Sequence, residues 1–291
     1  MAQLEPVDGT DVFLWKYLPS LPLAAVSAAL FTIATAALAW RIAKSRLWFC
    51  IPFAVGGAFQ IIGFSIRIAA HYYTNEIAPF VLQSIFILLA PVLYAASIYT
   101  VLGRLIRSVR GDRHSIVQPK WMTLIFVTGD FVALNVQGNA AGLTAKDSTR
   151  KIGEYIIIAG LFIQLILFAF FIIAASIFHI RMRKDIDGRP DSVPEVPWER
   201  GLQMIYACSA LIMSRSLFRA VEYIMGGDGY LLSTEWPMYA LDTAPMLLVQ
   251  IISVLWFPDK FSGYEKQPGM YMALLLPHRK RNAQASEDGQ E

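Results

Sequence analysis

The chain has 291 residues, of which 56% are hydrophobic and only 16% charged, and its formal net charge is +3. This composition and a mean hydropathy of +0.48 exclude an ordinary soluble domain and predict an integral membrane protein. The two cysteines, Cys50 and Cys208, lie in apolar stretches. They therefore predict small buried side chains, and neither a disulfide framework nor a metal site.

A tail and seven apolar segments follow one another along the chain. The tail, residues 1–20, is acidic where a cleaved signal peptide is basic, so we expect it to be retained outside the cell. The apolar segments are each long enough to cross about 30 Å of hydrocarbon as a helix. They are residues 21–40, 47–70, 79–103, 121–143, 153–178, 201–225 and 236–257, of which the fourth and sixth are the least apolar. Residues 21–257 therefore predict an all-α bundle of seven transmembrane helices, and residues 258–291 a cytoplasmic, partly disordered tail.

Lysine and arginine are unevenly distributed between the two sides of this predicted bundle. Eighteen lie in the connections after the first, third and fifth segments and in the C-terminal tail, whereas four lie on the other side. Connections rich in lysine and arginine stay in the cytoplasm. We therefore expect the N-terminus outside and the C-terminus in the cytoplasm. The three remaining basic residues, Arg67, Arg215 and Arg219, fall inside predicted spans.

Ionisable side chains inside the spans are the candidates for a functional site. Each costs about 2.5–3.5 kcal/mol at the bilayer centre, so such residues usually face the bundle interior and find partners. Helical geometry places Arg215, Arg219 and Glu222 on one stripe of the sixth helix, and the spacing of Arg219 and Glu222 permits an ion pair. The other candidates are Asp130 and Gln164, which we expect near the middle of their helices, and, further toward the outside, Gln137, Glu235, Tyr239 and Asp242.

Two interpretations of these polar residues stay open. In one, Arg67, Arg215 and Arg219 neutralise the buried acids of the other helices and hold the bundle together; the acids are Asp130, Glu222 and Asp242. In the other, the same residues form a site for the head group of an amphiphile or for a carboxylate that carries a proton. The GxxxG spacing of Gly138 and Gly142 favours close helix packing.

Motifs of nucleotide-driven pumps, metalloenzymes and retinal proteins are absent from the sequence. GxxxxGK[ST] does not occur, which excludes a P-loop pump. The four histidines lie in loops or at helix ends, so we expect neither a metal site nor a cofactor. The seventh segment contains no lysine, which argues against a retinal Schiff base. We therefore expect a protein that is not an enzyme.

Four stretches, in chain order, resemble the fungal RTA1-like family, also called the lipid-translocating exporter family. They are LYAASIYTVLGRLIR, FVTGDFVALNVQGNAAGL, GEYIIIAGLFIQLILFAFF and SRSLFRAVEYIMGGDGYLLSTEWPMYALDTAPM. The resemblance implies a fungal seven-helix protein connected with the movement or tolerance of amphiphiles, namely sphingoid long-chain bases, sterol-like amines and tetrapyrroles. It implies importance for Asp130, Gln137, Gly138, Gln164, Arg215, Arg219, Glu222, Glu235 and Asp242.

The leading hypothesis is a plasma-membrane translocator or exporter of amphiphilic lipids, whose head group is held by Glu222, Asp242 and Asp130. The second is a seven-helix lipid sensor, although the third helix lacks D-R-Y and the seventh lacks N-P-x2-Y. A third, an intramembrane enzyme, lacks convergent nucleophiles or metal ligands. We expect membrane lipids and a small amphiphile as partners, and neither nucleic acid nor nucleotide.

Overall fold

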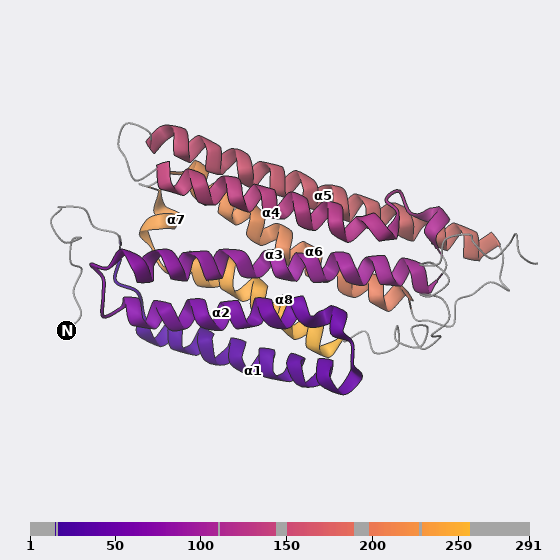
Figure 1. Ribbon diagram of the computed structural model, residues 1–291, viewed down its shortest axis with the longest axis horizontal. Coiled ribbons are helices and arrows are strands. Elements are labelled where there is room, and N and C mark those ends of the chain that lie inside the picture. Colours follow the sequence, from indigo (N-terminus) through magenta and orange to yellow (C-terminus); the bar gives the residue numbers. More distant parts are fainter. Residues whose placement is uncertain are drawn as a thin grey trace, which may run out of the picture.

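The protein is described by a computed structural model for residues 15, 17–109, 111–143, 150–188, 198–226 and 229–256. All regular elements within these ranges are helical. They are α1 (Leu21–Ser45), η1 (Trp48–Cys50), α2 (Ile51–Ala70), α3 (Ile77–Ser108), η2 (Asp112–His114), α4 (Pro119–Leu143), α5 (Arg150–Gly188), α6 (Trp198–Ile224), α7 (Tyr230–Ser233), the π-helix η4 (Met238–Thr243) and α8 (Ala244–Leu255). The long helices run side by side (Figure 1). Of the predicted tail of residues 1–20, residues 1–14 and 16 lie outside the described residues, as does the whole predicted tail of residues 258–291.

Within the described ranges, six helical segments are long and apolar enough to cross a membrane. They are Leu21–Ser45, Trp48–Ala70, Ile77–Ser108, Lys151–Ile186, Trp198–Ile224 and Met238–Leu255. Helix α4 is not among them, although its 25 residues exceed the roughly 20 that a span needs. Its hydropathy is lowered by Asp130, Asn135 and Gln137. The predicted all-helical membrane bundle is confirmed for six spans, while the seventh span and the orientation stay predictions.

The starts and ends of several helices follow from local sequence. Proline stands in the first turn of α1 and α2, where its missing N–H group would have no partner in any case. After α6 the chain turns at Gly226, whose φ of 70° lies in the left-handed region that glycine adopts without strain. Apolar sequence thus supplies the spans, and proline and glycine help to place their ends.

Neighbouring helices in the chain pack against one another, with α3 at the centre. Helix α3 contacts α2, α4 and α6, while α1 contacts α8 and thereby closes the bundle. Figure 1 shows α3 between α2 and α4, with α6 and α8 behind it. In its most apolar window 67% of α3 is buried, more than in any other of the six candidate spans. Polar side chains that face α3 are therefore shielded from lipid.

An aromatic cluster joins α3 to α4 and α5. The Tyr99 ring lies 5.2 Å from Phe126, 6.1 Å from Phe168 and 4.6 Å from Phe171, between ring centroids. Such edge and tilted contacts stabilise aromatic pairs beyond their buried area. They also hold the Tyr99 hydroxyl in place beside Asp130 of α4.

Two glycines of the bundle have opposite surroundings. A Cβ atom on Gly57 of α2 would overlap the Thr35 hydroxyl and the Gln250 amide, so this glycine allows α1, α2 and α8 to approach. Gly138 of α4 is exposed, and no described atom lies within 4 Å of where its Cβ would stand. The predicted close packing at Gly138 is therefore wrong for the described part of this chain, and the side-chain environment of Gly142 lies outside it.

The last span departs from the regular helix predicted over residues 236–257. The π-helix η4 precedes α8, and the Thr243 hydroxyl donates to the Met238 carbonyl, five residues back, at 3.1 Å. Pro245 in the first turn of α8 has no N–H group for the carbonyl four residues before it. The wider turn contains Asp242, which is buried. π-Turns inside helices frequently occur at functional sites.

Candidate functional site

Four ionisable side chains of α6 and η4 form one cluster, which we call the α6–η4 ion cluster. Arg215 and Arg219 each contact one oxygen of the Asp242 carboxylate. Arg219 Nη1 also pairs with Glu222 Oε2 at 2.9 Å, which confirms the predicted ion pair within the sixth helix. Arg215 and Asp242 are only 5% and 1% exposed. The cluster contains two cations and two anions, so its formal charges cancel.

Arg215 also connects α6 to the central helix. Its Nη2 atom donates to the Ile87 carbonyl of α3 at 3.4 Å. Pro91, four residues later in α3, lacks the N–H group that would normally bond to this carbonyl. In hydrocarbon such a freed backbone group needs another partner. Arg215 supplies that donor and is thereby positioned by both α3 and η4.

A second group of polar side chains, the Arg67 cluster, lies between α2 and the start of the last span. Arg67 is 1% exposed and pairs with Glu235 at 2.7 Å. Its guanidinium also donates to the Tyr239 hydroxyl at 3.2 Å and to Gln83 Oε1 and the Tyr17 hydroxyl at 3.3 Å each. One interpretation of the sequence pairs Arg67 with an acid inside the fourth, sixth or seventh helix. That interpretation is wrong for Arg67, because its partner is Glu235, which lies in the turn before the last span and faces the end of α2.

The segment before α1 covers this cluster. The Ser20 N–H group donates to both Glu235 carboxylate oxygens, at 2.9 and 3.0 Å. The Trp15 ring centroid lies 5.5 Å from the Arg67 guanidinium carbon, within the range of a cation–π contact. Trp15 itself is 5% exposed. The segment thus joins the beginning of the described chain to its last span.

Asp130 of α4 is set apart from both clusters. It is 2% exposed, and the Tyr99 hydroxyl donates to its Oδ2 atom at 2.8 Å. Its buried Oδ1 atom has no hydrogen-bond partner among the described residues. Nor does any lysine or arginine of the described ranges form a salt bridge with it. The prediction that an arginine neutralises Asp130 is therefore wrong: the arginines of α6 are engaged by the acids of η4 and of α6 itself.

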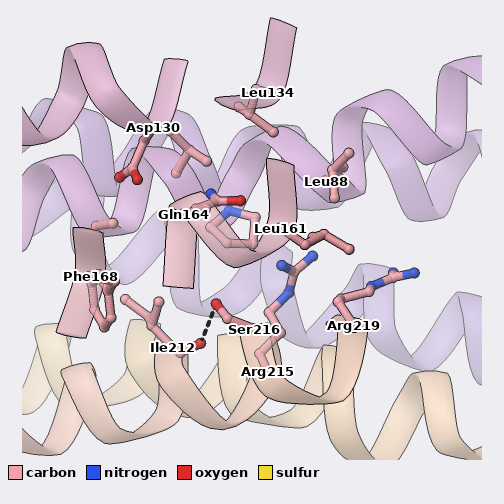
Figure 2. Close-up of a pocket in the computed structure, with 13 residues that line it drawn as sticks. Leu88, Asp130, Leu134, Leu161, Gln164, Phe168, Ile212, Arg215, Ser216 and Arg219 are labelled. Carbon is pink, nitrogen blue, oxygen red and sulfur yellow. Dashed lines mark hydrogen bonds between the residues drawn. The ribbon is translucent and has the colours of Figure 1, made fainter. Parts of the chain in front are cut away.

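Asp130 lines a small cavity between α3, α4, α5 and α6. The cavity measures about 20 Å³, and its polar lining comes from Asp130, Gln164, Arg215, Ser216 and Arg219. Figure 2 shows Arg215 and Arg219 extending from α6, with Asp130 and Gln164 across from them. This volume admits a water molecule but is far below the 300–1,000 Å³ or so of a typical ligand pocket. In this structure the space beside these residues is therefore too small for a typical ligand.

Comparisons with known proteins agree with this membrane-embedded arrangement. Residues 53–264 match the family described as RTA1 like protein. The chain belongs to the RTA1 like protein family. No solved structure matches it.

Several RTA1 like relatives come from Saccharomyces cerevisiae. "Protein RTA1" is 35% identical over 210 residues, 72% of this chain and 65% of the relative. "Protoporphyrin uptake protein 1" is 34% identical over 201 residues, 69% of this chain and 66% of the relative. "Sphingoid long-chain base transporter RSB1" is 28% identical over 275 residues, 80% of this chain and 71% of the relative. The chain thus spans slightly less than two thirds of the length of the first two relatives.

Within this RTA1 like chain the nine predicted site residues fall into three groups. Four of the nine line the cavity, and a fifth, Gln137, lies beside it and donates to Gln164 at 3.4 Å. The groups are Asp130, Gln137 and Gln164 at the cavity; Arg215, Arg219, Glu222 and Asp242 in the α6–η4 ion cluster, whose two arginines also reach the cavity; and Glu235 with Tyr239 in the Arg67 cluster.

Two buried tyrosines of α3 are missing from the sequence-based site. Tyr99 holds Asp130, and the Tyr94 hydroxyl donates to Gln250 at 3.3 Å. A signal was present, because a tyrosine inside an apolar span usually needs a partner for its hydroxyl. The spacing within one helix does not say which residue of another helix is that partner.

Proposed function

We propose that this protein moves amphiphilic lipids between the leaflets of a fungal plasma membrane and is not an enzyme. The observation that carries the proposal is the buried Asp130 carboxylate, which belongs to the lining of a small cavity and has one oxygen without a hydrogen-bond partner among the described residues. The names of two relatives, a sphingoid long-chain base transporter and a protoporphyrin uptake protein, support transport of amphiphilic molecules.

In the proposed mechanism the head group enters beside Asp130 and Gln164 while the hydrocarbon tail stays against apolar helix faces. This assignment differs from the expectation that Glu222 and Asp242 hold the head group, since both acids already face arginines. Arg215 and Arg219 keep η4 and α3 in position. The cavity must enlarge for a head group to enter, so the helices around it separate during transport.

The proposal includes α4 as a seventh span, the N-terminus outside and the C-terminus in the cytoplasm. Helix α4 packs along α3 and α5, both of which are candidate spans. A helix of 25 residues between two spanning neighbours has the length to share their depth. The distribution of lysine and arginine supports the same orientation.

Reconstitution in liposomes tests the proposal directly. The purified protein is expected to accelerate the movement of a labelled sphingoid base between leaflets relative to empty vesicles. Asp130→Asn should slow this movement at least tenfold, because it removes the carboxylate that faces the cavity. Asn135→Ala, on the exposed face of the same helix, is the matched control and should transport normally. Absence of acceleration for several amphiphiles would contradict the proposal and favour a lipid sensor.

A further inference from the structure

The closed cavity leaves one buried acid without a countercharge. The acids of the α6–η4 ion cluster face arginines, and Glu235 faces Arg67. Asp130, which lines the cavity, instead has the Tyr99 hydroxyl at one oxygen and no partner among the described residues at the other. A buried carboxylate without a cation is very costly when ionised. Something that the cavity can hold must therefore neutralise it.

We infer that Asp130 binds a proton in the closed structure and releases it when a cationic head group enters, so that the protein exchanges protons for its substrate. This inference rests on the proposed function and deepens it by naming the coupling ion. The cavity of about 20 Å³ has room for a water molecule, and a water can deliver or remove a proton. It is far too small for a whole amphiphile, so in this structure the proton neutralises Asp130 without the substrate.

The groups that face Asp130 from the neighbouring helices leave the proton as its partner. From α3, Tyr99 donates to Oδ2 and stays neutral. From α5, Gln164 lines the cavity, and its side chain is uncharged. From α6, Arg215 and Arg219 reach the cavity, but both contact Asp242. Asp130 can therefore lose its proton at low cost only when another cation arrives.

The exchange step balances in atoms and charge. The protonated Asp130 carboxyl transfers its proton to the cavity water, which leaves as hydronium. The carboxylate formed then pairs with the alkylammonium head group of the amphiphile. No electron transfer and no covalent bond to the substrate is involved. Because the two cations move in opposite directions, an excess of protons on one side of the membrane suffices to draw substrate toward that side.

Infrared spectroscopy of the purified protein tests the proton site without transport. At neutral pH the wild type should show the carbonyl stretch of a protonated carboxylic acid, and Asp130→Asn should lose it. Tyr99→Phe keeps the carboxyl group and removes its donor, so it should shift the band without removing it. Glu199→Gln, an exposed acid in the first turn of α6, should leave the band unchanged. A band that survives Asp130→Asn, or no band in the wild type, would overturn the inference.

Measurement of proton release completes the test. Together with transport assays, it distinguishes failure of the proton exchange from failure of the proposed translocation. A long-chain primary amine added to the weakly buffered protein should release protons in proportion to binding, whereas an alcohol of the same chain length should release none. If lipid movement occurs but is indifferent to a pH gradient, the exchange is refuted and translocation stands. If the infrared band is present but no amphiphile moves, the proton site stands and the translocator is refuted.

Discussion

At the scale of the residue, Asp242 and Asp130 are both buried carboxylates in different electrostatic settings. Asp242 faces two arginines, whereas Asp130 faces a tyrosine hydroxyl and a cavity. Helical spacing alone predicts the Arg219–Glu222 pair, because both residues lie on one helix. It does not predict the Arg67–Glu235 pair, which joins residues 168 positions apart and depends on how α2 and the last span rotate and meet.

Asp242→Asn should destabilise the protein strongly, since it leaves Arg215 and Arg219 with a single acid. Breaking a buried ion pair by removal of one partner costs about 3–5 kcal/mol. Adding Arg215→Gln to Asp242→Asn restores the charge balance, so the double variant should lose less stability than the sum of the two single variants. Thermal unfolding in detergent measures all three. Additive losses would contradict a coupled α6–η4 ion cluster.

At the scale of the element, hydropathy predicts where the helices are but not how long they run. Helix α3 continues to Ser108 and α5 to Gly188, beyond the predicted apolar segments, because their polar ends remain helical where no proline or glycine intervenes. The π-helix was not predicted. It lies next to Pro245. The sequence does not show that this wider turn contains Asp242 with its two arginine partners.

Gly57→Ala should destabilise the junction of α1, α2 and α8. The added methyl group would displace the Gln250 amide from the Thr35 hydroxyl, to which it donates at 2.7 Å. Overpacking of this kind typically costs about 1–3 kcal/mol.

Gly138→Ala is the matched control on an exposed helix face, and its unfolding temperature should not fall. Equal unfolding temperatures for the Gly57→Ala and Gly138→Ala variants would show that α2 does not need glycine for close approach.

At the scale of the whole molecule, the number of spans decides on which side each connection lies. Composition predicts a membrane bundle because 56% hydrophobic residues cannot be buried in a soluble chain of this charge. Whether α4 spans the membrane is harder to predict from the sequence. The polar residues that lower its hydropathy include Asp130, which belongs to the cavity, so the most informative helix for function carries the weakest signal for spanning.

Cysteine labelling in intact cells will determine the topology. The native Cys50 and Cys208 are 1% and 0% exposed, so they should give little background. The four positions for single cysteines are exposed, namely Lys44, Glu76, Arg113 and Lys151. If seven helices span with the N-terminus outside, an impermeant reagent should label cysteines at 76 and 151, and those at 44 and 113 only after permeabilisation. Labelling of 113 and 151 from the same side would show that α4 does not span.

The Arg67–Glu235 pair also bears on the biosynthesis of the protein. Arg67 enters the membrane with α2, long before the ribosome has made Glu235. During that interval the charged Arg67 side chain within a span is costly. Gln83, only 16 residues later, is the first partner of Arg67 to be synthesised after Arg67 itself. We therefore expect insertion to finish in two stages, in which α3 shelters Arg67 first and the last span then completes its contacts.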